Sequence, residues 1–124
     1  MLHRPNKLLI VEDQPLIALM LEELAEALGW EVAATAYSAE AAMRALDHVT
    51  PALAVLDIDL GDSTSLGIAA RCETLSIPVV FVTGYATSQV PLECGHAPVL
   101  SKPFSEEEFD AAVRHAIVER LRHQ

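Results

Sequence analysis

The sequence predicts an α/β fold, in which helices cover both faces of a doubly wound parallel sheet of five strands. Continuous apolar runs recur along the chain, as strands buried on both faces require. Segments with apolar residues at helical spacing alternate with these runs. The three clearest runs are residues 8–11, 53–56 and 79–82. Residues 1–124 are treated as a single domain, because the length suits one core and no linker or repeat interrupts it.

The first half of the chain begins the strand and helix alternation. After the first strand, Pro15 suits the start of a helix and Gly29 suits its end. The apolar residues of this helix that fall at helical spacing are Leu16, Leu19, Met20, Leu24 and Ala27. A second strand is predicted over 32–37, followed by a helix that Ser38 caps and that ends before Pro51. The residues on its apolar face are Ala42, Ala45, Leu46 and Val49.

The second half continues the same alternation. A third helix is predicted over 66–75, and a short fifth strand over 99–101. The connection over 86–95 contains a proline and little periodicity, which predicts a short or irregular fourth helix. Ser105 and Glu108 form a capping box before the last helix. The apolar stripe of that helix is Phe109, Ala112, Val113, Ala116, Ile117 and Leu121.

Composition excludes several classes of protein. Eighteen acidic and eight basic residues give a net charge of -10, which disfavours binding to nucleic acid or anionic lipid. The longest apolar run, 16–21, is too short to span a bilayer, and no signal-peptide pattern precedes it. Cys72 and Cys94 have no metal-ligand or disulfide spacing. A soluble cytoplasmic protein is expected.

Residues suited to phosphoryl chemistry close four of the five predicted strands. Glu12 and Asp13 follow the first strand, Asp57 ends the third, Thr83 ends the fourth and Lys102 follows the fifth. The carboxyl ends of parallel strands meet at one edge, where ligands bind. Clustered carboxylates predict a site for Mg²⁺ or Mn²⁺. Asp57 is placed to attack phosphorus, while Lys102 and Thr83 supply a charge and a hydrogen bond for phosphoryl oxygens.

Each of these residues also has a structural explanation when it is taken alone. Glu12 and Asp13 suit the start of a helix, and an aspartate such as Asp57 suits a turn. Thr83 is a good strand residue, and a lone Lys102 is usually at the surface. Their joint placement at adjacent strand ends favours the functional interpretation, because turns and caps do not require this combination.

Four stretches together resemble the response regulator receiver domains, a CheY-like family. They are Leu-Ile-Val-Glu-Asp at 9–13, Val-Leu-Asp at 55–57, Val-Thr-Gly at 82–84 and Lys-Pro-Phe at 102–104. The resemblance covers nearly the whole chain and its motifs are specific. It implies a flavodoxin-like sheet with strand order 2-1-3-4-5 and a cis peptide bond between Lys102 and Pro103.

The resemblance also implies roles for the site residues. Asp57 would be the phosphoacceptor, and Asp13 and Asp57 would bind Mg²⁺ together with the Asp59 carbonyl. Glu12 would help through water, and Lys102 and Thr83 would bind the phosphoryl group. The donor would be a phosphohistidine of a sensor histidine kinase or histidine phosphotransferase in a two-component system. The modified domain would switch contacts with a downstream protein partner, without being a turnover enzyme.

One position departs from the family pattern. Val99 stands where receivers usually carry an aromatic residue that moves together with the threonine. The stretches 81–85 and 98–104 resemble the FATGUY subclass of mostly single-domain bacterial receivers, which also lacks that aromatic. We hypothesise that residues 83–95 reorder on phosphorylation, and that Asp59 and Tyr85 set the rate of dephosphorylation.

Two other functions remain open from the sequence. Asp57-Ile58-Asp59 matches the DxD core of an aspartyl phosphatase of haloacid dehalogenase type, but that motif belongs on a first strand and normally continues with a threonine where this chain has Gly61. The second alternative is a pseudo-receiver that binds partners without phosphorylation, suggested by Val99. Retention of all the chemical residues opposes it.

Overall fold

A computed structural model describes residues 6–61, 63–84 and 97–122. The described chain alternates strands and helices in the order β1 (Lys7–Val11), α1 (Pro15–Ala27), β2 (Glu31–Ala36), α2 (Ala39–Leu46), β3 (Leu53–Asp57), α3 (Leu66–Thr74), β4 (Val79–Thr83), β5 (Val99–Ser101) and α4 (Glu106–Arg122). The predicted short or irregular helix over 86–95 lies outside the described residues. It stays a prediction.

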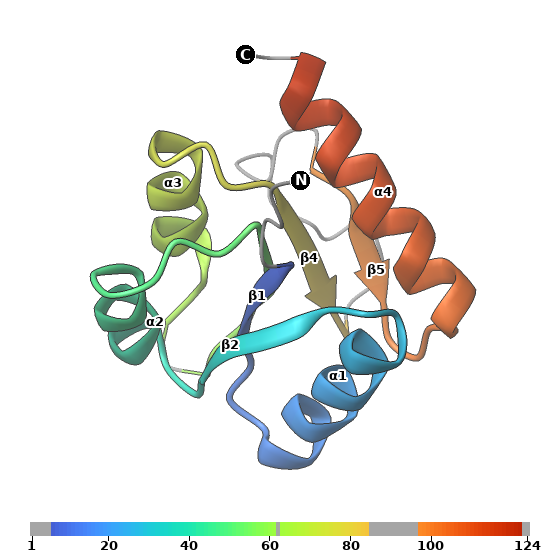
Figure 1. Cartoon of the computed structure of the whole chain (residues 1–124). Coiled ribbons are helices and arrows are strands. Elements are labelled where there is room, and N and C mark those ends of the chain that lie inside the picture. Colours follow the sequence, from blue (N-terminus) through green and yellow to red (C-terminus); the bar gives the residue numbers. More distant parts are fainter. Residues whose placement is uncertain (1–5, 62, 85–96, 123–124) are drawn as a thin grey trace.

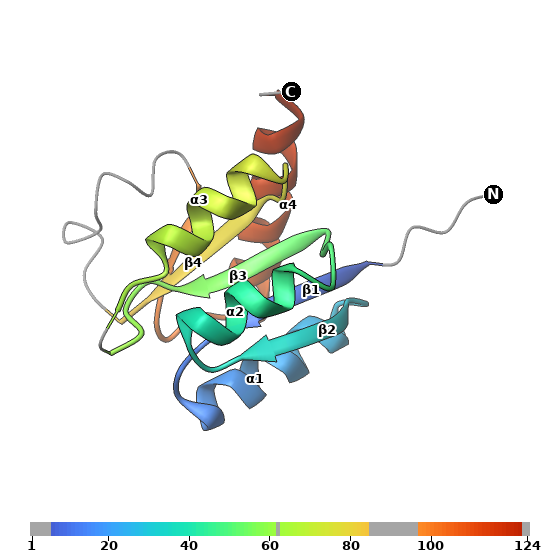
Figure 2. The same ribbon diagram turned by 90° about the vertical axis from the view of Figure 1, so that its left-hand side faces the viewer.

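The five strands form one parallel sheet in the order β2-β1-β3-β4-β5, as the sequence predicts. Figure 1 shows α2 and α3 on one side of this sheet, and α1 and α4 on the other. Figure 2 shows the arrowheads of β2 and β3 at the same edge. Parallel pairing therefore brings the ends of successive strands together, although long stretches of sequence separate them.

Two apolar layers fill the space between the sheet and its helices. In β1, Leu9 and Val11 join the layer under α2 and α3, whereas Leu8 and Ile10 join the layer under α1 and α4. All four side chains are fully buried. Because successive strand side chains point to opposite faces, burial of both faces explains the continuous apolar runs.

Local signals at the helix ends are confirmed. Pro15 is the first residue of α1, and Gly29 adopts a φ of 92° just beyond its end. The Ser38 hydroxyl accepts a hydrogen bond from the Ala41 N–H at 3.1 Å. The Ser105 hydroxyl accepts from the Glu108 N–H, and the Glu108 carboxylate accepts from the Ser105 N–H, which completes the predicted capping box.

The predicted apolar face of α1 is confirmed only at Leu24, which is partly buried against the core, although the helix itself is confirmed. Leu16, Leu19 and Met20 are 70%, 48% and 57% exposed. The face that packs on the sheet is instead built on Ala18, Leu21 and Ala25. Apolar residues occur on more than one side of this helix, so its pattern does not decide the buried side. Small alanines allow the backbone of α1 to approach the sheet closely. Tertiary packing therefore determines which side of this helix is buried.

Some boundaries also differ from the prediction. Strand β2 begins at Glu31 and ends at Ala36, so Tyr37 lies beyond it. Helix α2 ends at Leu46, and Val49 therefore does not share its apolar face. The apolar stripe of α4 is confirmed except at Leu121, which is 62% exposed. Among the described helices, none is both long and apolar enough to cross a membrane.

Candidate functional site

The sheet brings the predicted site residues to one edge. Glu12 and Asp13 directly follow β1, whereas Asp57 and Thr83 are the last residues of β3 and β4. Lys102 directly follows β5. Since β1, β3, β4 and β5 are consecutive neighbours in the sheet, these side chains leave from adjacent strand ends.

Backbone hydrogen bonds hold each strand end to the next. The Glu12 N–H donates to the Ala36 carbonyl at 3.0 Å, which ties the end of β1 to β2. The Lys102 N–H donates to the Thr83 carbonyl at 2.8 Å, which ties the end of β5 to β4. The positions of the functional side chains thus depend on the sheet itself and not on flexible loops.

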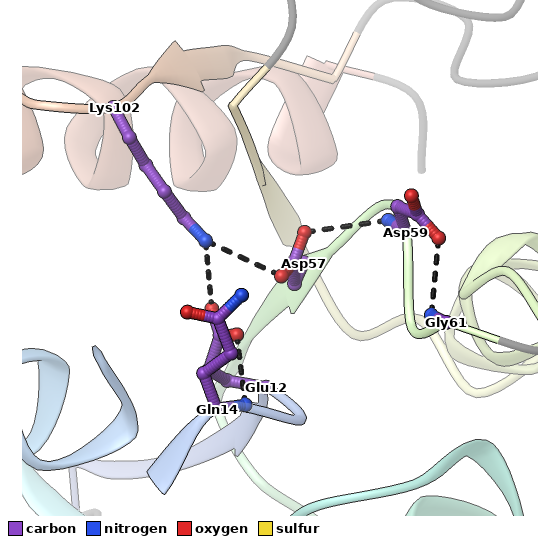
Figure 3. Close-up of polar contacts among 6 residues, drawn as sticks. All are labelled: Glu12, Gln14, Asp57, Asp59, Gly61 and Lys102. Carbon is purple, nitrogen blue, oxygen red and sulfur yellow. Dashed lines mark hydrogen bonds and ion pairs between the residues drawn. The ribbon is translucent and has the colours of Figure 1, made fainter. Parts of the chain in front are cut away.

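The lysine is the centre of the polar contacts (Figure 3). Lys102 Nζ donates to Glu12 Oε1 at 3.1 Å and to Asp57 Oδ2 at 3.3 Å. The other Asp57 oxygen, Oδ1, accepts from the Asp59 N–H at 3.3 Å. The second Glu12 oxygen accepts from the Gln14 N–H at 3.2 Å. Each carboxylate therefore accepts one charged hydrogen bond from the lysine and one hydrogen bond from a neighbouring backbone N–H.

Burial disfavours the ionised form of the carboxyl groups at this site. Glu12 is fully buried and Asp57 is only 5% exposed. Burial, followed by the neighbouring Asp57 carboxyl, raises the pKa of Glu12 to about 7, against the lowering effect of Lys102. Glu12 therefore favours its protonated form more than an exposed glutamate does.

The pKa of Lys102 is also raised, although burial acts against the shift in this case. Burial alone would lower the pKa of Lys102, but its hydrogen bond to Glu12 and the charge of Asp57 outweigh that effect. The pKa of Lys102 is therefore raised above its usual 10.5. Lys102 stays positively charged at neutral pH, while the pKa of Glu12 stays raised in spite of that charge.

The acidic residues have the geometry and chemistry of a divalent metal site. Carboxylate oxygens of Glu12, Asp13 and Asp57 lie within 4.8 Å of one another. Hard oxygen ligands of this kind suit Mg²⁺ or Mn²⁺, and a divalent cation would stabilise the ionised form of Glu12 against burial and against the neighbouring Asp57 carboxyl, the causes of its raised pKa. The donor set therefore fits the ion that the sequence predicts.

Asp59 takes part through its backbone, and its side chain is directed elsewhere. The Asp59 carboxylate accepts from the Gly61 N–H at 3.0 Å, on the side away from Asp57 (Figure 3). Gly61 has a φ of 83°. Sequence reasoning gave neither Gly61 nor Gln14 a role in the site. An Asp-x-Gly spacing after a strand is a signal of a side-chain turn that could have identified Gly61.

Other predictions have mixed outcomes. Thr83 lies at the expected strand end and is 1% exposed. The Lys102–Pro103 peptide bond is cis, as the resemblance implies. Val99 pairs with Phe81 across β4 and β5. Tyr85 and nearly all of the 83–95 segment lie outside the described residues, so their proposed roles stay predictions.

Cys72 has the surroundings of a core residue. Cys72 is a free, fully buried thiol in α3, and burial raises its pKa to about 11. Such a thiol is neutral and inaccessible, which makes it a core residue. Cys94 lies outside the described residues.

Comparison with known proteins identifies the family. The model of the response regulator receiver domain matches residues 8–114. The chain is 35% identical over 117 residues to the phyllosphere-induced regulator PhyR of Methylorubrum extorquens, covering 90% of this chain and 43% of PhyR. It therefore spans less than half of that relative.

Two solved structures agree with this result. SdrG from Sphingomonas melonis Fr1 is 32% identical, with a TM-score of 0.77 and coverage of 94% of this chain and 96% of SdrG. The receiver domain of PhyR from Erythrobacter litoralis is 30% identical, with a TM-score of 0.71 and coverage of 96% and 92%. The chain belongs to the response regulator receiver domain family. Domains of this family act in two-component systems, interact with histidine kinases or phosphotransferases, and generally bind Mg²⁺ at an acidic pocket.

Proposed function

We propose that this domain accepts a phosphoryl group on Asp57 from a phosphohistidine of a sensor histidine kinase or histidine phosphotransferase. The observation that carries the proposal is the environment of Asp57. Its nearly buried carboxylate lies between the Lys102 ammonium and the Asp59 N–H, next to two further acids at the same sheet edge. A phosphoryl group there would meet both positive charge and hydrogen-bond donors.

The transfer would exchange one bond at phosphorus. An Asp57 oxygen attacks the phosphorus atom while the N–P bond to the donor histidine breaks, and the bonding electron pair returns to the imidazole. Lys102 Nζ would pair with one phosphoryl oxygen, and the Thr83 hydroxyl would donate to another. Water later attacks the acyl phosphate, which releases inorganic phosphate and restores Asp57.

The reaction would depend on Mg²⁺ or Mn²⁺. The ion would be held by the Asp13 and Asp57 carboxylates and the Asp59 carbonyl oxygen, with Glu12 acting through water. When bound, it would neutralise the phosphoryl oxygens and the surrounding carboxylates. Each molecule is modified once in a cycle, so we expect a signalling domain of the cytoplasm that switches contacts with a partner protein, not a turnover enzyme.

The lifetime of the modified state would depend on Asp59. Asp59 lies two positions after Asp57 and its N–H donates to the acceptor carboxylate, so its side chain would flank the path of an attacking water once it turns back towards Asp57. We expect Asp59→Asn to change the decay rate of the phosphorylated protein, as measured by intact mass against time. An unchanged decay would remove this role. The same proposal for Tyr85, and the assignment to the FATGUY subclass, concern residues 81–85 that are described only in part.

The proposal is tested by incubation with acetyl phosphate or phosphoramidate, with Mg²⁺ or with EDTA. We expect intact mass to rise by one phosphoryl group, only with metal, with a bond that is stable in acid and labile in base. Asp57→Asn should abolish the gain, whereas Asp110→Asn on α4 should not. No adduct on the folded wild type would favour a pseudo-receiver. Repeated turnover of the donor would favour a phosphatase.

A further inference from the structure

The loop after β3 contains a fourth carboxylate that stands apart from the acidic cluster. Asp59 is only two residues from Asp57, yet the residues whose carboxylates converge within 4.8 Å are Glu12, Asp13 and Asp57. The Asp59 carboxylate instead accepts the Gly61 N–H and closes a side-chain turn (Figure 3). The conformation of this loop therefore keeps the Asp59 carboxylate out of the predicted set of metal ligands.

Gly61 has the conformation that this turn requires. Its φ of 83° lies in the left-handed region, which glycine adopts at little cost and alanine does not. A Cβ at this position would lie 3.7 Å from Asp13 Oδ2, so the glycine backbone also lies beside a predicted metal ligand. A larger side chain here would extend into the space next to that carboxylate.

The rest of the loop is anchored around this turn. Asp59 forms an isolated antiparallel bridge with Thr64, and the Leu60 N–H donates to the Ser63 carbonyl at 2.9 Å. The Ser65 N–H donates to the Ile58 carbonyl at 3.1 Å. The backbone is fixed at both ends, and the hydrogen bond from the Gly61 N–H holds the Asp59 carboxylate on the side of Gly61.

The number of carboxylates around a site distinguishes Mg²⁺ from Ca²⁺. Mg²⁺ binds in near-octahedral geometry, keeps several waters and typically uses one or two carboxylates. Ca²⁺ takes about six to eight oxygens and gains affinity as the number of charged ligands rises. A site that admitted the Asp59 carboxylate as well would move from the first pattern towards the second.

We propose that the Asp59–Gly61 turn is a specificity device, which keeps the Asp59 carboxylate away from the metal and so favours Mg²⁺ or Mn²⁺ over Ca²⁺. Gly61 is a positioning residue in this account, since it acts through Asp59 and Asp13. The inference rests on the metal site of the proposed function and adds to it the selection of the ion.

The test compares the affinities of Mg²⁺, Mn²⁺ and Ca²⁺ by isothermal titration calorimetry at constant ionic strength, without any phosphoryl donor. Gly61→Ala disfavours the left-handed conformation and should release the Asp59 side chain. We expect the ratio of Ca²⁺ affinity to Mg²⁺ affinity to rise by about tenfold or more. Adding Asp59→Asn to that variant should abolish the rise, because the released side chain no longer carries a charge.

Two single variants separate this device from general damage to the loop. Asp59→Asn keeps an oxygen that accepts the Gly61 N–H, so the ratio should stay within about twofold of wild type even if both affinities fall together. Asp59→Glu keeps Gly61 but is too long to close the same turn, and its carboxylate should raise the ratio as Gly61→Ala does. Asp59→Glu also tests the proposal if Gly61→Ala fails to fold.

The outcomes for the two proposals are distinct. Normal binding of Mg²⁺ by wild type, with the same ion preference in folded Gly61→Ala and in Asp59→Glu, would overturn this inference and leave the phosphoacceptor site intact. Failure of wild type to bind Mg²⁺ or Mn²⁺ at all would overturn it together with the metal dependence of the proposed function.

Discussion

Replacing Glu12 by glutamine should reduce the loss of stability of the metal-free protein as pH rises through about 7. Glu12 is fully buried, and its pKa in the folded protein is raised from 4.5 to about 7. A glutamine has nearly the same shape and stays neutral at every pH. Its one carbonyl oxygen can replace either of the two Glu12 oxygens that accept from Lys102 and from the Gln14 N–H, so one of these hydrogen bonds is lost at every pH. The substitution therefore removes the ionisation of this side chain and leaves its packing in place.

The sign and size of the effect follow from proton linkage. Between pH 4.5 and about 7 the folded state binds more protons at Glu12 than the unfolded state does. The contribution of Glu12 to stability is therefore fully present below pH 4.5 and is lost as pH rises through about 7. Each pH unit between the two pKa values corresponds to about 1.4 kcal/mol, so the full loss is about 3 kcal/mol. We expect the stability of Glu12→Gln relative to wild type to rise by about 2–3 kcal/mol between pH 5 and pH 8.

Urea unfolding in EDTA at several pH values from about 5 to 8.5 measures this difference, with the fluorescence of the single tryptophan, Trp30, as the probe. Glu23→Gln, an exposed glutamate of α1, is the matched control and should leave the pH dependence unchanged. Mg²⁺ at saturating concentration should narrow the gap at pH 8, because a bound cation stabilises the ionised carboxylates. Parallel pH profiles for wild type and Glu12→Gln would refute the reasoning.

Three further predictions concern packing. Gly67 is an exposed position inside α3 where a Cβ would have no atom within 4 Å, so Gly67→Ala should raise the free energy of unfolding by about 0.5–1 kcal/mol, and a lower melting temperature would contradict this. Phe109 is a fully buried residue of α4 in the layer between this helix and the sheet, so Phe109→Ala should cost about 3–5 kcal/mol in urea unfolding. Leu21→Ala should cost about 2–5 kcal/mol, whereas Leu19→Ala should stay within about 0.5 kcal/mol in the same assay; equal losses would contradict the orientation of α1.

The contrast between Leu19 and Leu21 shows what the sequence could predict about the fold. Apolar runs buried on both faces occur in few architectures, so the strands, their parallel pairing and the helical layers followed from the pattern. The orientation of α1 did not follow. Its sequence is apolar on more than one side, and the buried side depends on how closely the helix backbone approaches the sheet. That quantity depends on tertiary packing rather than on period.

The same division applies to the site. Glu12, Asp57, Thr83 and Lys102 could be placed together because each closes a strand, and the ends of neighbouring parallel strands must meet. Side-chain directions could not be predicted in this way. Asp57 and Asp59 are two residues apart at the end of β3, yet the Asp57 carboxylate joins the acidic cluster and the Asp59 carboxylate accepts the Gly61 N–H. Local backbone geometry accompanies that difference, and periodicity contains no information about it.

The rigid sheet holds buried carboxyl groups close together at one edge, where their ionised forms are unfavourable. Glu12 is fully buried at the end of an apolar strand, where an ionised carboxylate is unfavourable, and the hydrogen bond from its N–H to Ala36 prevents it from moving away. A looser framework would let the acids separate and would relieve their repulsion. Because the framework does not, the repulsion persists until a cation or a proton reduces it. The apolar layers that stabilise the fold thus hold the carboxylates in an arrangement that favours binding of a positive ion.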